Sequence, residues 1–139
     1  MDTFEKLLAK WQPTVLSLLR FITGLLLFQY AIAKFLKIPV LPYFANLPAS
    51  FAAAGAFELV GGTLLMLGLF TRPAAFILSG LMAFAYFIGH MFKNGIGAPI
   101  WHPLLNGGTL AILSCFACLY LSTAGGGPYS LDAMMRKKS

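Results

Sequence analysis

Four long apolar stretches limit what this chain can fold into. They cover approximately residues 15–33, 51–70, 74–92 and 104–124. Each is about 20 residues long, the length at which a helix crosses the hydrocarbon core of a bilayer. Only 10% of the residues are charged, against about 25% in a soluble domain. We therefore predict one all-α transmembrane domain over residues 1–139, a membrane-embedded four-helix bundle, because helices satisfy their backbone polar groups internally.

The positive charges predict an orientation for this bundle. If the four stretches cross the membrane in turn, seven of the ten Lys and Arg residues lie on the side of the two termini. Such an excess marks the cytoplasmic side, so we expect an N-in, C-in, multi-pass protein of the cytoplasmic (inner) membrane. Residues 1–12 place apolar side chains at helical spacing, which predicts a short interfacial helix. The basic run at 136–138 is expected near anionic lipid heads, and the sequence shows no pattern typical of nucleic-acid binding.

Glu58 is a lone carboxylate inside the second apolar stretch. An unpaired carboxylate at that depth costs several kcal/mol, so a partner or a function is expected. Lys34 lies at the predicted outer end of the first stretch, as the last member of a stripe at helical spacing. This stripe consists of Arg20, Gly24, Leu27, Ala31 and Lys34. Because the stripe carries both charges and two small residues, we predict that it faces the interior.

Each of the other apolar stretches also carries polar or small residues along one helical face. These stripes are Ala54, Gly55, Glu58, Gly61 and Gly62; Ser79, Ala83, Tyr86 and His90; and Asn106, Thr109, Leu113, Phe116 and Tyr120. We predict that all four stripes face inward, because polar groups avoid lipid. Helix direction then brings Lys34, Glu58, His90 and Asn106 together in the outer half, with Trp101 and His102 above them. Arg20, Arg72 and Tyr120 are expected to gather at the inner end.

This cluster has two interpretations. In the first, Lys34 neutralises Glu58 and fixes the packing of the first two helices. In the second, the cluster is a polar pocket for the head group of a ligand. The second interpretation gives these candidate ligand-binding residues: Lys34, Glu58, His90, Asn106, Tyr86, Trp101 and Arg20. Arg20 and Arg72 are also typical of cationic side chains that extend to the membrane interface.

Two other chemical patterns are weak. His90, His102 and Glu58 do not follow a metal-ligand spacing, so no metal site is predicted. Cys115 and Cys118 form a C-x-x-C pair within an apolar helix, without a nearby cation to lower a thiol pKa. Their setting favours a role as small apolar residues over redox chemistry.

The chain resembles the DoxX family of small four-helix membrane proteins. The matching segments, in order, are Leu19-Arg20 through Gly24, Ala33-Lys34-Phe35, Phe57 to Gly62, Leu67 to Arg72, Asn106-Gly107-Gly108, and Gly125 to Asp132. Carried over by position, Arg20, Lys34, Glu58, Arg72 and Asn106 are the residues of interest. Thr109 is a departure, since many relatives have an acidic residue just after the Asn-Gly turn. This difference removes a possible second carboxylate and weakens the case for a proton-coupled mechanism.

The resemblance implies more than one function. Founding members look like the membrane subunit of thiosulfate:quinone oxidoreductase, and other relatives look like chaperones or cargo receptors. The first hypothesis is therefore a redox-associated subunit that binds a quinone-like or amphiphilic ligand, with Phe44, Tyr86, Trp101 and Phe116 as aromatic walls. The chain has no recognisable electron carrier, so a redox partner protein would supply the electrons. The alternatives are a non-enzymatic scaffold or chaperone, a homo-oligomer held by glycine-rich faces, and, less favoured, a small transporter.

Overall fold

The computed structural model describes residues 2–36, 49–92 and 101–138. The elements, in order, are α1 (Asp2–Lys10), α2 (Gln12–Phe35), α3 (Ala49–Leu67), α4 (Thr71–Phe84), the π-helix η2 (Ala85–Met91), α5 (Pro103–Asn106), α6 (Thr109–Ala124) and α7 (Leu131–Lys138). Within these ranges the chain forms helices and turns and no strand, which confirms the all-α class. The structure also has the short amphipathic helix expected at the N-terminus, which is α1.

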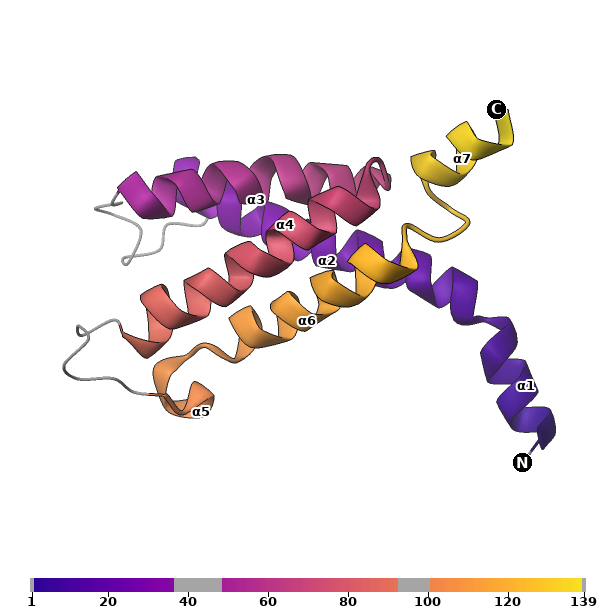
Figure 1. Cartoon of the computed structure of the whole chain (residues 1–139), viewed down its shortest axis with the longest axis horizontal. Coiled ribbons are helices and arrows are strands. Elements are labelled where there is room, and N and C mark those ends of the chain that lie inside the picture. The colour runs from indigo at the N-terminus through magenta and orange to yellow at the C-terminus, as the bar shows by residue number, and fades with distance from the viewer. Residues whose placement is uncertain (1, 37–48, 93–100, 139) are drawn as a thin grey trace.

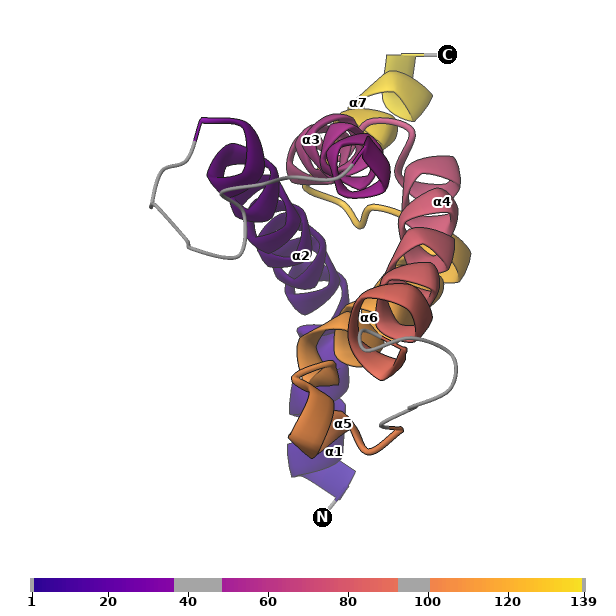
Figure 2. The ribbon, with the colours of Figure 1, turned by 90° about the vertical axis from the view of Figure 1, so that its left-hand side faces the viewer.

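The long helices associate as two neighbouring pairs. α2 packs along α3, and α4 packs along α6, while the contact between α3 and α4 is smaller. Figure 2 looks along these helices and shows the pair α2–α3 beside the pair α4–α6. The core lies where the pairs meet, and its most deeply buried large side chains are Leu65, Leu78 and Leu121.

The outer surface of the helices is apolar. Many large hydrophobic side chains are exposed, among them Val60, Phe76, Phe84 and Phe116 at 61–65%. Two helices, Gln12–Phe35 and Thr71–Met91, are long and apolar enough to cross a membrane, and Ala52–Leu67 and Thr109–Ala124 are shorter apolar helices. A surface of this kind suits contact with lipid and not with water.

Glycines set the distance between α2 and α3. A Cβ atom added at Gly24 would lie 2.7 Å from the carbonyl oxygen of Gly62, and one added at Gly62 would lie 2.8 Å from that of Gly24. The two backbones therefore touch at this level, as small residues allow at helix interfaces. The predicted inward stripe of α2 is confirmed, since Arg20, Gly24, Leu27, Ala31 and Lys34 are all buried.

The two ends of the helix pairs differ in what they carry (Figure 1). One end, here called the α5 end, holds α5, the end of η2, the C-terminal end of α2 and the N-terminal end of α3. The opposite end, here called the α7 end, holds the turn between α3 and α4, the segment 125–130 and α7. Polar side chains gather at both ends, with Lys34, Glu58 and Asn106 at the α5 end and Arg20 and Asp132 at the α7 end.

The prediction for the fourth apolar stretch is wrong in its orientation. Thr109, Leu113, Phe116 and Tyr120 are all exposed, so this stripe faces outward and Phe116 is no interior aromatic wall. The reason is a break at Gly107, whose φ of 73° is the left-handed conformation that glycine tolerates. The break separates Asn106 from the helical phase of α6, which buries Ala111, Cys118 and Leu121. Ser79 also donates a 2.8 Å hydrogen bond to the carbonyl of Cys115, which holds this small-residue face against α4.

Candidate functional site

Lys34 and Glu58 form a direct ion pair between α2 and α3. The Nζ atom of Lys34 lies 2.8 Å from Oε1 of Glu58. Lys34 is 8% exposed and Glu58 is 4% exposed, so both charged groups are buried. Gly55 makes room for this contact, because a Cβ there would lie 3.1 Å from Cδ of Lys34. The predicted pairing of these two residues is confirmed.

The second carboxylate oxygen of Glu58 is the unusual feature of this pair. Oε2 is buried and has no hydrogen-bond partner among the described residues. Lys34 also makes a further interaction beyond this ion pair. A buried acceptor without a donor costs about 1–3 kcal/mol. This site therefore favours an added donor, such as a hydroxyl group, near Oε2.

A second polar group joins η2, α5 and the residues next to them. The hydroxyl of Tyr86 donates to the carbonyl of Trp101 at 2.5 Å and accepts from Nδ2 of Asn106 at 3.3 Å. Nδ1 of His90 lies 3.2 Å from the carbonyl oxygen of Asn106. A Cβ at Gly108 would approach the Tyr86 ring to 2.5 Å, so this glycine leaves space for the ring. Tyr86 and His90 both project from a π-helix, a form often found at functional sites.

The residues predicted to converge at the α5 end thus fall into two groups. Lys34 and Glu58 come from the pair α2–α3, whereas Tyr86, His90 and Asn106 come from η2 and α5. The hydrogen bonds given above link residues within each group. The side chain of Trp101 is 68% exposed, so this residue contributes its carbonyl group and no buried aromatic wall. Phe44 lies outside the described residues.

Arg20 lies at the α7 end, the same end as Arg72, but its side chain is buried and does not extend outward as expected. It is 4% exposed, and its Nη2 donates a 2.8 Å hydrogen bond to the carbonyl of Tyr129. Its Nε and Nη1 atoms are buried without a hydrogen-bond partner among the described residues. Asp132 supplies an opposing charge to this guanidinium. Arg20 therefore holds the segment 125–130 against α2.

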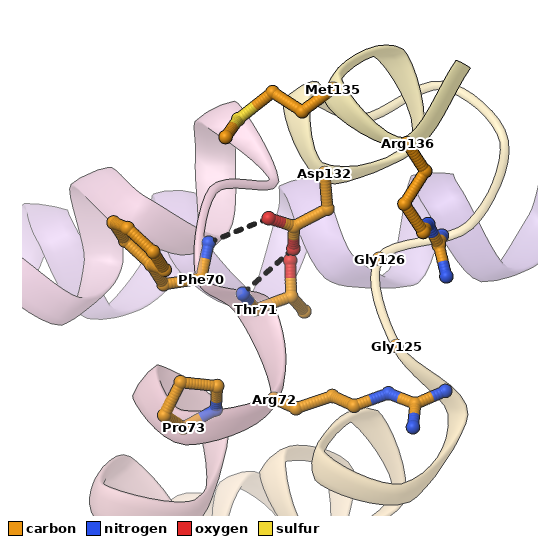
Figure 3. Close-up of a pocket in the computed structure, with 9 residues that line it drawn as sticks. All are labelled: Phe70, Thr71, Arg72, Pro73, Gly125, Gly126, Asp132, Met135 and Arg136. Atoms are coloured by element: carbon orange, nitrogen blue, oxygen red, sulfur yellow. Dashed lines mark hydrogen bonds between the residues drawn. The ribbon is translucent and has the colours of Figure 1, made fainter. Parts of the chain in front are cut away.

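Asp132 ties α7 to the turn between α3 and α4. Its Oδ1 accepts the N–H of Phe70 and its Oδ2 accepts the N–H of Thr71, both at 2.9 Å (Figure 3). Its own N–H donates to the carbonyl of Gly68 at 2.9 Å. The carboxylate thus caps the start of α4 from a distant part of the chain. No role was predicted for Asp132 from the sequence, although it ends the glycine-rich segment that forms part of the family resemblance.

The same contacts set the protonation of Asp132. Partial burial alone raises the pKa of this carboxyl group, but the N–H groups of Thr71 and Phe70 and the charge of Arg136 outweigh it. The result is a pKa below the ordinary value of 3.8. Because the pKa is lower in the folded state than in the unfolded chain, the ionised carboxylate stabilises the folded state.

Replacement of Asp132 by Ala is expected to destabilise the fold by about 0.5–2 kcal/mol, the usual loss for a helix cap. In the wild-type protein this contribution is complete above the ordinary pKa of 3.8 and is lost as the pH falls below it through the folded-state pKa. Thermal unfolding of both proteins from pH 6 to pH 3 (roughly the range of carboxyl titration) measures the difference. A difference that stays constant down to the lowest pH would contradict this role.

Comparison with known proteins agrees with this architecture. The model of the DoxX family matches residues 15–91, which include most of α2 and all of α3, α4 and η2. A protein of Haemophilus influenzae, described only as uncharacterized, is 40% identical over 134 residues, which cover 94% of this chain and 98% of its own. No solved structure matches the chain. The fold and these matches define a helical protein of a membrane-associated class.

The chain belongs to the DoxX family. The matched range contains Arg20, Lys34, Glu58, Tyr86 and His90. It ends before α5, so the segment with Asp132 lies beyond it.

Proposed function

We propose that this DoxX-family chain crosses the inner membrane four times as a four-helix bundle, with both termini in the cytoplasm. Two helices have the length and composition of membrane spans. The shorter helices α3 and α6 pack along them, and their exposed large side chains are apolar as well. The excess of Lys and Arg on the side of the termini supports the orientation. On this topology the α7 end faces the cytoplasm and the α5 end faces outward.

We further propose that the chain is the membrane subunit of a redox system and binds a quinone-like amphiphile beside Lys34 and Glu58. The observation that carries this proposal is the buried Oε2 of Glu58, which lacks a hydrogen-bond partner among the described residues and lies next to an ammonium group. A quinone presents a carbonyl oxygen, which can accept a hydrogen bond from an ammonium group. Its reduced form presents a hydroxyl group, which a carboxylate oxygen can accept.

The chemistry assigned to the chain's own residues is limited to binding and proton transfer. Lys34 orients the ligand through its head-group oxygen, and Glu58 accepts or returns a proton there. His90 lies on the neighbouring helix pair and is the candidate for passing that proton onward. The chain carries no recognisable electron carrier, so a partner protein supplies or removes the electrons.

Quinone binding to the purified protein in lipid nanodiscs tests this proposal. Titration with a short-chain quinone is expected to show saturable binding that Glu58→Gln and Lys34→Met each weaken by about tenfold or more, the size expected when a charged hydrogen bond is lost. Glu5→Gln and Lys6→Met are matched controls, since both residues are exposed on α1, and they should leave binding unchanged.

The opposite results identify a different role for the pair. If folded wild-type protein does not bind the quinone, the ion pair serves only packing, and the chain is better described as a scaffold or chaperone. The direct contact of Lys34 with Glu58 is the observation that favours this second candidate. Binding that survives both substitutions would place the quinone elsewhere.

A further inference from the structure

The α7 end contains a pocket that the proposed quinone site does not involve. It is open to the outside, has a volume of about 450 Å³, and lies between the first turn of α4, the start of α7 and the end of α6. Its lining residues are Phe70, Thr71, Arg72, Pro73, Gly125, Gly126, Asp132, Met135 and Arg136. Two guanidinium groups and one carboxylate therefore share a single cavity.

Glycine fixes the position of one of these guanidinium groups. A Cβ added at Gly125 would lie 3.2 Å from Nε and 3.4 Å from Nη2 of Arg72. The Arg72 side chain thus lies across the backbone at Gly125, whose φ of 85° also requires glycine. Figure 3 shows Arg72 and Arg136 directed toward the side of the pocket that Gly125 and Gly126 form. The two cations come from α4 and α7, which are far apart in the sequence.

The carboxylate in the pocket is already engaged. Both oxygens of Asp132 accept backbone N–H groups, from Phe70 and Thr71. Arg136 also acts on Asp132 through its charge. One carboxylate opposes two guanidinium groups, so the lining keeps a net positive charge. Planar guanidinium groups are well suited to phosphate, which they bind with two parallel hydrogen bonds.

Three other residues of the lining are apolar and exposed. Phe70 is 59% exposed and Met135 is 54% exposed, and Pro73 lies beside them in the lining. A small soluble anion would make no favourable contact with these apolar side chains. The glycerol backbone and first acyl carbons of a lipid would contact them. Two further lysines follow Arg136 in the sequence, which adds to the attraction of an anionic surface.

We propose that this pocket binds the phosphate head group of an anionic phospholipid. Arg72 and Arg136 hold the phosphate, while Phe70, Pro73 and Met135 contact the apolar part of the lipid. The leaflet would be the cytoplasmic one, and this point alone depends on the proposed topology. The lipid site would fix α7 to the membrane surface beside the turn between α3 and α4.

Native mass spectrometry of the full chain with added lipids tests the proposal. Phosphatidylglycerol and phosphatidylcholine with the same acyl chains are the two probes, and the wild-type protein should retain the anionic lipid preferentially. Arg72→Gln and Arg136→Gln should each lower this preference by about fivefold, the effect of losing one cation near a lipid surface. Arg72→Lys keeps the positive charge but loses the planar guanidinium group, so its preference should lie between those of the wild-type protein and Arg72→Gln. Lys6→Gln, an exposed cation on α1, is the control and should change nothing.

Three results would overturn the proposal. These are equal retention of both lipids by the wild-type protein, an unchanged preference in both arginine variants, and an equal loss in Lys6→Gln. Displacement of the bound lipid by millimolar inorganic phosphate would instead assign the pocket to a soluble anion. If a glutamine variant fails to fold, the Arg72→Lys variant and a salt titration of the wild-type protein test the proposal in its place. A phosphate contact weakens as salt increases, so retention of the anionic lipid should fall. Quinone titration of the folded arginine variants should be normal, so the two proposals fail separately.

Discussion

Replacement of Lys34 by Met will destabilise the fold by about 3–5 kcal/mol, the usual cost of removing one partner from a buried ion pair. The carboxylate of Glu58 would remain 4% exposed between α2 and α3, with both oxygens then lacking the ammonium that now lies 2.8 Å from Oε1. Glu58→Gln should cost less, because an amide is neutral and still offers an oxygen to Lys34. Unfolding in a denaturing detergent, followed by circular dichroism, measures these differences.

A double variant separates the structural role of the pair from its proposed role in binding. Lys34→Met combined with Glu58→Leu removes both charges and fills the same space with apolar side chains. Replacements of this kind are often neutral or stabilising, so we expect the double variant to recover most of the stability lost in Lys34→Met. Quinone binding should nevertheless remain absent, because neither the ammonium nor the carboxylate is present.

The outcome for the double variant is decisive in both directions. Recovery of stability together with wild-type quinone binding would remove the pair from the ligand site. If the Lys34→Met variant is only slightly less stable than the wild-type protein and the double variant is no more stable than Lys34→Met, the ion pair contributes little to the stability of the fold.

The part of the fold predicted best from the sequence is the contact between α2 and α3. There the polar and small residues repeat at intervals of three and four within one uninterrupted helix, so the spacing alone gives the buried face. A lone acid opposite a lone base in apolar surroundings also leaves few alternatives. The ion pair between Lys34 and Glu58 follows directly from these two constraints.

The face of α6 could not be predicted in the same way. The spacing argument assumed that Asn106 and the following residues belong to one helix, and the conformation of Gly107 interrupts it. Two of the three residues that α6 buries, Ala111 and Cys118, are small. Small apolar residues differ little in hydrophobicity from the residues that face lipid, so the sequence gives no clear signal for the buried face. Packing on α4 decides the orientation, and that contact is not local in sequence.

The contacts at the α7 end could not be predicted from the sequence either. Arg20 and Tyr129 are 109 positions apart, and Asp132 reaches back to Phe70 and Thr71. In each contact one partner is a backbone N–H or carbonyl group, which nearly every residue has, so no residue pattern indicates which residues will meet. The predicted end of the fourth apolar stretch at residue 124 agrees with the end of α6, but no sequence pattern indicated the pocket that Gly125 and Gly126 line.

Gly24→Ala is expected to destabilise the fold by about 3 kcal/mol, at the upper end of the range for overpacked cores. The added Cβ would lie 2.7 Å from the carbonyl oxygen of Gly62 and 2.8 Å from the backbone nitrogen of Met66. These neighbours are backbone atoms and cannot rotate away as a side chain can, so α2 and α3 must move apart.

Gly80→Ala is the matched control for this substitution. Gly80 also lies within a helix, but a Cβ there would meet nothing within 4 Å. Alanine favours helix over glycine by about 1 kcal/mol, so this variant should be as stable as the wild-type protein or slightly more stable. Equal effects of the two substitutions would mean that helix propensity, and not the contact between α2 and α3, governs the result.

The same variant connects the helix contact to the proposed ligand site. Gly24 and Lys34 lie on one buried face of α2, and their contacts on α3 are Gly62 and Glu58. Moving the helices apart at Gly24 therefore lengthens the distance from Lys34 to Glu58 as well. We expect Gly24→Ala to weaken quinone binding without altering any group that touches the ligand, and Gly80→Ala to leave it unchanged. Wild-type binding in a destabilised Gly24→Ala protein would show that the ion pair does not depend on this close contact.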